Sequence, residues 1–210
     1  GIWNCPSGYT CSNGACISSA PTGLIGYWKF DDGTAKDSSA LANDGVNNGA
    51  VFVDYGKVGK AVGFDGVGYK VVGVGKILDD VSVNEGSVSA WAYPTGNGFN
   101  RYVFDSNLNS RTYIQHSNGN FYVTKGEPGA SVTIKSNAPL NQWYHITLTW
   151  KNGVMRGYLD GNLIGEKSYT YNTGVQANRA NIGSQGTDKT FGGVIDEVRV
   201  YKRELTATEI

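Results

Sequence analysis

Residues 141–161 read NQWYHITLTWKNGVMRGYLDG, a pattern that predicts a β-hairpin. Apolar and polar residues alternate with a period of two, so one face of the first strand is apolar and is expected to face the core. The Asn152-Gly153 dipeptide suits the centre of a tight primed turn, where both residues need positive φ. The segment from Val154 to Leu159 is then expected to return as the partner strand. The core-facing residues of the first strand are predicted to be Tyr144, Ile146, Leu148 and Trp150.

The rest of the chain has the same character of short strands and tight turns. A second turn, Asp160-Gly161, follows the first at a spacing that is typical of a meander in an antiparallel sheet. The 210 residues include 30 glycines, 13 tyrosines and 5 tryptophans but a single methionine, which favours β-structure over helix. Because all-β sandwiches of this length commonly form one domain, we expect one main core.

Charge and hydropathy exclude two classes of partner. The 18 basic side chains balance 18 acidic ones and are scattered along the chain, so no basic surface for nucleic acid or anionic lipid is expected. No apolar run approaches the roughly 20 residues that span a bilayer, so no membrane insertion is predicted. No signal peptide precedes Gly1, and the chain is therefore expected to be a mature or trimmed form.

The first 23 residues differ in kind from the remainder. They contain Cys5, Cys11 and Cys16 among Gly, Ser, Asn and Pro, with almost nothing apolar to bury. A small disulfide-stapled segment in an oxidising compartment is the expected explanation, with the pairing open, and residues 18–23 read as a linker. A zinc site is the alternative, but three cysteines without a nearby histidine make an incomplete ligand set. The odd cysteine is expected to pair with a residue upstream in a longer chain or with another molecule.

Residues 24–210 contain short sequence motifs in a fixed order, which include Trp28-Lys-Phe-Asp31, Gly59-Lys-Ala-Val-Gly-Phe-Asp-Gly66, Ser87-Val-Ser-Ala-Trp91, Gln142-Trp-Tyr-His145, Tyr158-Leu-Asp-Gly161 and Phe191-Gly-Gly-Val-Ile-Asp-Glu-Val-Arg-Val-Tyr201. In these motifs and their order, the segment resembles the laminin-G-like domains of the concanavalin A-like lectin/glucanase superfamily. It implies an all-β jelly-roll sandwich of two antiparallel sheets. It also implies an extracellular carbohydrate-binding, adhesive or spacer module, frequently with a calcium ion.

The last predicted strand gives a physical reason to look for that ion. Alternation places Asp196 with Val194, Val198 and Val200 on the more apolar face, and a buried carboxylate needs hydrogen bonds, a cation or a metal. The resemblance implies that the first and last strands lie side by side, which would bring Asp31 near Asp196. An all-oxygen set of this kind suits a structural calcium ion. The alternative is that Asp196 accepts backbone N–H bonds and the loop acids are solvated. The predicted calcium ligands are Asp31, Asp37, Asn43 and Asp196.

Catalytic readings fail on specific residues. The glucanase members of the superfamily carry Glu-x-Asp-x-Glu on one strand, and that spacing is absent from this sequence. Asp196 and Glu197 are adjacent, so they are expected to point to opposite faces. The two histidines, His116 and His145, are expected to serve in packing or in a backbone hydrogen bond. The prediction is therefore a non-catalytic module with no catalytic residues.

Binding is the class that remains. Sugars stack on aromatic rings, and several aromatic residues are expected on loops or strand edges, although core or rim packing is the favoured role for each of them alone. The expected partners are a glycan or a cell-surface protein, with location outside the cell. The alternative is a structural subunit of a surface filament or adhesin that contacts copies of itself through the N-terminal arm. The candidate aromatic residues are Tyr93, Phe99, Tyr102, Tyr113, Tyr122, Tyr169, Tyr171 and Phe191.

Overall fold

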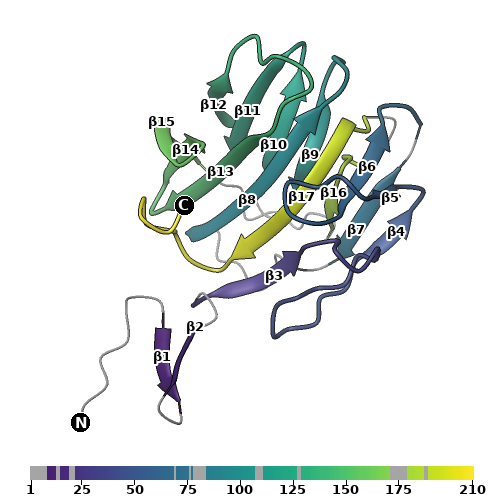
Figure 1. The fold of residues 1–210 in the computed structure, drawn as a ribbon. Helices are drawn as coiled ribbons and strands as arrows, with labels where there is room; N and C mark the ends of the chain where they lie inside the picture. The colour runs from purple at the N-terminus through teal and green to yellow at the C-terminus, as the bar shows by residue number, and fades with distance from the viewer. Residues whose placement is uncertain are drawn as a thin grey trace.

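Two antiparallel sheets packed face to face make up the body of the protein (Figure 1). The computed structural model describes residues 9–12, 15–18, 22–68, 70–75, 77, 84–106, 111–126, 129–170, 179–186 and 189–210. Among these residues there is no helix, and so none long and apolar enough to cross a membrane. The predicted jelly-roll sandwich is confirmed.

The first sheet has eight strands, with β17 and β8 near its centre. In spatial order they are β15 (Asn162–Ser168), β14 (Val154–Leu159), β13 (Tyr144–Lys151), β8 (Glu85–Pro94), β17 (Gly192–Tyr201), β6 (Ala61–Asp65) and β5 (Val51–Val53), with β3 (Leu24–Trp28) pairing with the second half of β17. Every pairing is antiparallel. The first and last strands of the sandwich therefore lie side by side, as the sequence predicts.

The second sheet has seven strands. Their order is β12 (Ala130–Lys135), β11 (Asn120–Lys125), β10 (Thr112–Ser117), β9 (Arg101–Ser106), β16 (Ala180–Ile182), β7 (Val71–Gly75) and β4 (Val46–Asn48). A separate hairpin of β1 (Tyr9–Ser12) and β2 (Ala15–Ser18) belongs to neither sheet. Its register places Cys11 opposite Cys16, whereas Cys5 lies outside the described residues. The disulfide and the domain boundary at residue 24 remain predictions.

The hairpin of β13 and β14 forms as predicted. Asn152 and Gly153 have φ of 49° and 79°, and the next turn repeats this geometry at Asp160 and Gly161 with 48° and 81°. Both turns thus place two consecutive residues in the left-handed region, where Asn, Asp and Gly are tolerated best. The four predicted core residues of β13 are all buried and join a single cluster between the sheets that includes Trp28, Phe104, Phe121 and Ile195.

The opposite face of β13 is covered by the C-terminal segment. Thr147 and Thr149 are fully buried although they alternate with the core residues. The Ser87 hydroxyl donates to the Arg203 carbonyl at 2.8 Å and accepts the Leu205 N–H at 2.9 Å. These bonds fasten residues 203–205 across the outer face of the eight-stranded sheet.

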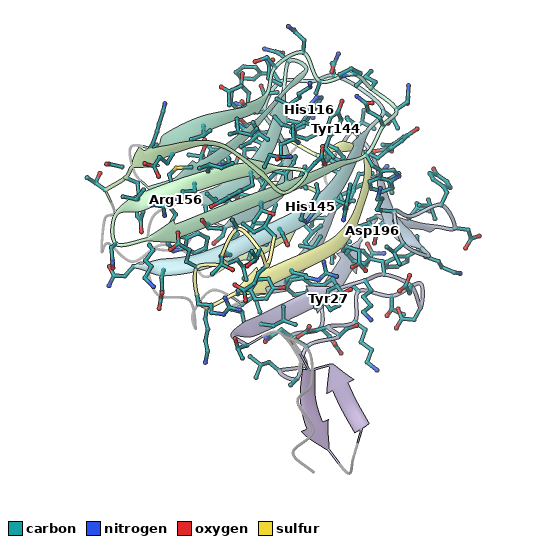
Figure 2. The ribbon with its side chains drawn as sticks, turned by 60° about the vertical axis from the view of Figure 1, so that its left-hand side comes forward. Tyr27, His116, Tyr144, His145, Arg156 and Asp196 are labelled. Atoms are coloured by element: carbon teal, nitrogen blue, oxygen red, sulfur yellow. The ribbon has the colours of Figure 1, made fainter. Side chains whose placement is uncertain are left out.

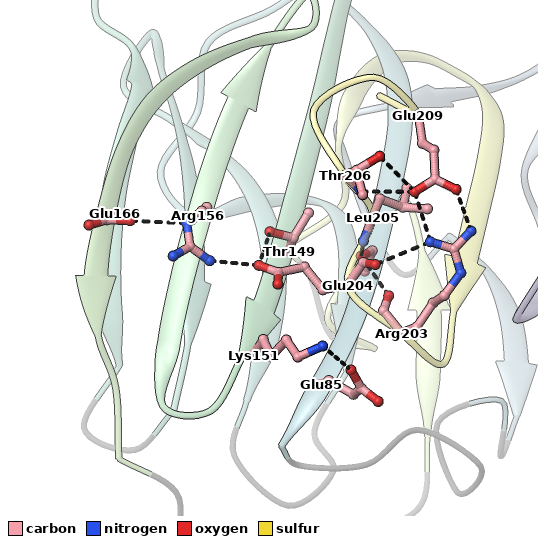
Figure 3. A network of polar contacts seen from close by, with 11 residues as sticks. Glu85, Thr149, Lys151, Arg156, Glu166, Arg203, Glu204, Leu205, Thr206 and Glu209 are labelled. Carbon is pink, nitrogen blue, oxygen red and sulfur yellow. Dashed lines mark hydrogen bonds and ion pairs between the residues drawn. The ribbon is translucent and has the colours of Figure 1, made fainter.

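Ion pairs extend this attachment on both sides. Arg156 on β14 pairs with Glu204 at 2.6 Å and with Glu166 on β15 at 3.0 Å. Arg203 pairs with Glu209 at 2.6 Å (Figure 3). The end of the described chain is thereby held by hydrogen bonds and ion pairs rather than by apolar packing alone.

A β-bulge in β17 corrects the predicted orientation of Asp196. The pairing with β8 shifts register between Asp196 and Arg199, and Glu197 has a φ of 53°. One extra residue reverses the alternation, so Ile195 and Val198 both face the core while Asp196 points to the outer side of the sheet. The sequence-based placement of Asp196 with Val198 and Val200 was wrong because period-two counting has no means of detecting a bulge.

Candidate functional site

The predicted calcium ligands do not come together in one shell. Asp37 accepts four hydrogen bonds from within the chain: N–H groups of Tyr27, Ser39 and Asn43, each at 2.8 Å, and the Ser39 hydroxyl at 2.6 Å. The Asn43 side chain donates to the Ile25 carbonyl at 2.8 Å. Asp37 and Asn43 therefore organise the acidic loop by hydrogen bonds.

Asp31 and Asp196 hold a different segment, residues 54–60. Asp31 accepts the Lys60 N–H at 3.1 Å, and Asp196 accepts the Val58 N–H at 2.9 Å and that of Glu197 at 2.7 Å. In the described part of the chain, no group of three or more His, Cys, Asp or Glu side chains is placed to hold a metal ion. These four residues do not fit a common calcium site, and the ion stays a prediction from the sequence.

Burial and hydrogen bonding shift the pKa of Asp196 in opposite directions. Burial raises the pKa of this carboxyl to about 6, although the N–H groups of Val58 and Glu197 act to lower it. Asp196 projects from the outer face of the eight-stranded sheet, as does His145 on β13 (Figure 2). The hydrogen bonds of Asp196 match the alternative prediction from the sequence, in which its carboxylate accepts backbone N–H groups.

The candidate aromatic residues fall into several environments. Phe99 is exposed, whereas Phe191 and Tyr169 are buried in the core cluster, which corrects their placement on the surface. Tyr93 packs against Trp143 with ring centroids 5.3 Å apart, on the outer face of the eight-stranded sheet. Tyr171 lies outside the described residues.

Tyr102 and Tyr113 meet on the outer face of the seven-stranded sheet. Phe104, Ile114 and Ile182 of this sheet face the core, so their neighbours in sequence, Asp105, Tyr113, Gln115 and Asn181, face outward. The pairing of β9 with β10 shifts register between Ile114 and Gln115; Val103 and Phe104 therefore both face the core and Tyr102 faces outward. The ring centroids of the two tyrosines are 5.4 Å apart, edge to face. The register places Asp105 opposite both Tyr113 and Asn181. The outward residues of β9, β10 and β16 therefore form one polar and aromatic cluster: Tyr102, Asp105, Tyr113, Gln115 and Asn181.

Arg111 completes this cluster, and the six residues are called the Asp105 cluster below. The guanidinium of Arg111 lies 5.5 Å from the Tyr102 ring and 5.0 Å from that of Tyr113. It donates to the Tyr102 hydroxyl and to Asp105 Oδ1, both at 3.2 Å. Asp105 thereby holds the Arg111 guanidinium near the rings of Tyr102 and Tyr113.

Asp105 is the unusual member of the cluster. Its side chain is 0% exposed, and Oδ2 has no hydrogen-bond partner among the described residues. Burial raises the pKa of this carboxyl to about 6, although the positive charges of Arg111, Arg179 and Lys189 act to lower it. A buried carboxylate oxygen without a donor is costly, so Asp105 depends on the positive charge of Arg111 beside it.

A hollow adjoins the cluster on the same face. Its volume is about 630 Å³, and its lining includes Arg179 and Asn181 from the β16 region, Gly73 on β7, and Asn43 and Asp44 from the acidic loop. Asn181 faces both the hollow and Asp105, since its Cα pairs with that of Asp105. The site thus combines ring faces, a carboxylate, an amide and guanidinium groups around an open depression.

Sequence reasoning selected the two tyrosines but missed Asp105, Arg111 and Asn181. Arg111 stands just before the next strand, β10, and Asn181 lies far along the chain on β16, so the pairing of β9 with β10 and β16 brings both of them beside Asp105. An acidic residue in an otherwise apolar strand, Tyr102-Val-Phe-Asp105, was the signal available in the sequence.

The histidines pack against aromatic rings, as expected. His116 is fully buried with its ring centroid 4.7 Å from that of Phe121, and neither nitrogen has a hydrogen-bond partner in the described structure. His145 lies 5.0 Å from the Trp91 ring.

A family model described as the concanavalin A-like lectin/glucanases superfamily matches residues 68–210. The chain belongs to this superfamily. Among solved structures, domain 4 of AbnA, an extracellular arabinanase from Geobacillus stearothermophilus in complex with arabinotriose, has a TM-score of 0.71 and 24% identity over 89% of this chain and 95% of that one. The binding domain of Paraclostridial Mosquitocidal Protein 1 has a TM-score of 0.66 and 19% identity, over 89% of this chain and 50% of that one. The binding domain of botulinum neurotoxin DC in complex with SialylT has a TM-score of 0.63 and 15% identity, over 90% of this chain and 50% of that one. At these identities the likeness to solved structures establishes the fold.

Proposed function

We propose that this protein is a non-catalytic carbohydrate-binding module that binds a glycan over the Asp105 cluster. The observation that carries the proposal is the Arg111 guanidinium, which Asp105 fixes against the rings of Tyr102 and Tyr113, close to an open hollow. Sugars present both hydroxyl groups and apolar ring faces, which this combination would satisfy together.

Each group has a role in this proposal. Tyr113 is partly exposed and offers its ring for stacking, whereas Tyr102 is buried and supports Arg111 from below. Asn181 and Gln115 supply amide donors and acceptors. Because Arg111 is fixed by Asp105 and Tyr102, its remaining N–H groups are held ready for a sugar oxygen.

Similar structures support a glycan as partner. Two of them were solved with arabinotriose and with SialylT, and one belongs to an extracellular enzyme. We propose a secreted or cell-surface location on this basis. The calcium ion stays a prediction from the sequence. Because Asp37 and Asp196 already accept hydrogen bonds within the chain, we expect the fold to hold without the ion, and the test is given in the Discussion.

A second candidate function is a filament or adhesin subunit. The observation that favours it is the separate β1–β2 hairpin, which pairs with neither sheet and could contact a neighbouring copy. Sedimentation separates the two functions: ordered polymers that dissociate when residues 1–23 are deleted would support the subunit.

Binding to a glycan array, followed by calorimetry with the best-bound oligosaccharide, tests the carbohydrate proposal. Asp105→Asn removes the carboxylate charge that fixes Arg111 in the site, and the loss of a charged hydrogen bond worth about 1.5–3 kcal/mol predicts roughly 10–100-fold weaker binding. Asp54→Asn is the matched control, because Asp54 is exposed beside β5 of the other sheet. Equal binding by both variants would contradict the assignment of the site.

A further inference from the structure

The surroundings of the Asp105 cluster contain more positive charge than the protein itself neutralises. Three cations, Arg111, Arg179 and Lys189, act electrostatically on Asp105. Of these, Arg111 alone forms an ion pair within the described residues, at 3.2 Å from Asp105. Arg179 and Lys189 therefore stand beside the site without a carboxylate partner in that part of the chain.

Two guanidinium nitrogens are buried and lack acceptors. The Nε atoms of Arg111 and Arg179 have no hydrogen-bond partner among the described residues. Burying such a donor without an acceptor costs free energy, more so for a charged group. The planar fork of arginine matches a carboxylate, which can accept two parallel N–H bonds.

Arg179 is placed where it can bind a carboxylate in the hollow. Arg179 and Asn181 both line the depression of about 630 Å³. Gly186, at a φ of 84°, makes room for the guanidinium, because a Cβ there would lie 2.5 Å from Arg179 Nη1. Asp44 also lines this hollow, where it accepts the Asp37 N–H at 2.8 Å, and Arg179 is the cationic residue of the lining.

We propose that the glycan bound at this site carries a carboxylate, as a uronic or sialic acid unit does, and that Arg179 binds that carboxylate with Lys189 adding electrostatic attraction. The inference rests on the proposed function and names its ligand class. The neutral part of the glycan contacts Tyr113 and Arg111, while its acidic unit occupies the hollow. Asp105 does not repel it, because its charge is offset by Arg111.

Matched pairs of acidic and neutral oligosaccharides test this inference. The probes are trigalacturonate with its fully methyl-esterified form, and 3′-sialyllactose with lactose, in calorimetry at low salt. Wild type should bind the acidic member of at least one pair roughly tenfold or more tightly, and added salt should reduce that preference. Equal affinity for the members of both pairs would overturn it.

Variants locate the effect. Arg179→Gln should reduce the acidic preference to within about threefold while neutral oligosaccharides keep their affinity. Lys167→Gln on the exposed edge strand β15 is the matched control and should keep the preference. Lys189→Gln removes a second positive charge and should reduce the preference for acidic sugars in part. This variant replaces Arg179→Gln as the test if Arg179→Gln does not fold. A preference that survives both substitutions would also overturn the inference.

The outcomes separate this inference from the proposed function. One outcome is that neutral sugars bind, Asp105→Asn weakens their binding, and acidic sugars bind no more tightly than neutral ones. The module would then bind glycans at this site, and the proposed acidic class of ligand would be wrong. If neither acidic nor neutral glycans bind to wild type, both are wrong.

Discussion

Replacing His116 should remove a large part of the acid sensitivity of the fold. His116 is fully buried between Phe121 and Phe191, with ring centroids at 4.7 and 6.3 Å, and burial lowers its pKa from 6.5 to about 4. A base with a lowered pKa in the folded state takes up its proton more readily when unfolded. The free energy of unfolding should therefore fall as pH drops below about 6.5, with no further loss from this group below about 4.

The expected size of this effect follows from the two pKa values. At 1.36 kcal/mol per pKa unit, the full difference between pH 7.5 and pH 3 would be about 3 kcal/mol, and at pH 5 about 2 kcal/mol is already lost. Leucine at position 116 cannot take up a proton. Between pH 7.5 and pH 5, the unfolding free energy of His116→Leu should therefore fall by about 2 kcal/mol less than that of wild type. His145, whose pKa burial also lowers to about 4, is present in both proteins and cancels from the comparison.

Urea unfolding followed by tryptophan fluorescence at the two pH values measures this difference. The comparison uses the pH dependence of each protein, so a general loss of stability in the variant does not affect it. If His116→Leu is too unstable to measure, NMR titration of His116 in wild type replaces it, with no protonation expected above about pH 5. Equal pH dependence in the two proteins would refute the reasoning.

Three further predictions concern the loop anchors and the cysteines. Asp196→Ala should lower the unfolding free energy by about 2–3 kcal/mol because residues 54–60 lose a buried acceptor, whereas the exposed control Asp54→Ala should change it by less than about 0.5 kcal/mol in urea unfolding. Chelation with EDTA should leave the wild-type Tm unchanged, because Asp37 and Asp196 already accept hydrogen bonds; a fall in Tm that added calcium restores would instead establish the calcium ion predicted from the sequence. Alkylation of unreduced protein should label Cys5 alone, since the register of β1 and β2 favours a bond between Cys11 and Cys16, and labelling of all three by mass spectrometry would exclude a disulfide.

Local patterns in the sequence were sufficient for the sheets and their turns. Asn152-Gly153 and Asp160-Gly161 specify positive φ by residue type, and the alternation in β13 identifies its buried face without any knowledge of the neighbours. These features depend on residues close together in the chain. The antiparallel pairing of β3 with β17 was reached through family resemblance rather than from the residues alone.

The site depended on information that the local pattern does not contain. The bulge at Asp196 inverts the face of one residue, and it was invisible because Glu197 is not a residue that favours positive φ. Arg111 reaches Asp105 only because β9 and β10 pair in one particular register. Tyr169 was placed on the surface although it lies in the core, since an isolated tyrosine after a strand carries no signal of the cluster that covers it.

The place of β17 in the eight-stranded sheet has a consequence for synthesis of the protein. Strands β3, β6 and β8 all pair with β17, which ends at Tyr201, and β3 and β6 are held in this sheet mainly through that strand. A chain emerging from the ribosome therefore carries the partners of its central strand, with their edges unpaired, until residues 192–201 have been made. Long-range pairing of this kind is slow, and unpaired edges promote aggregation. Chaperone binding to nascent chains should consequently persist until residues 192–201 are released, and truncation before β17 should yield insoluble protein rather than a smaller domain.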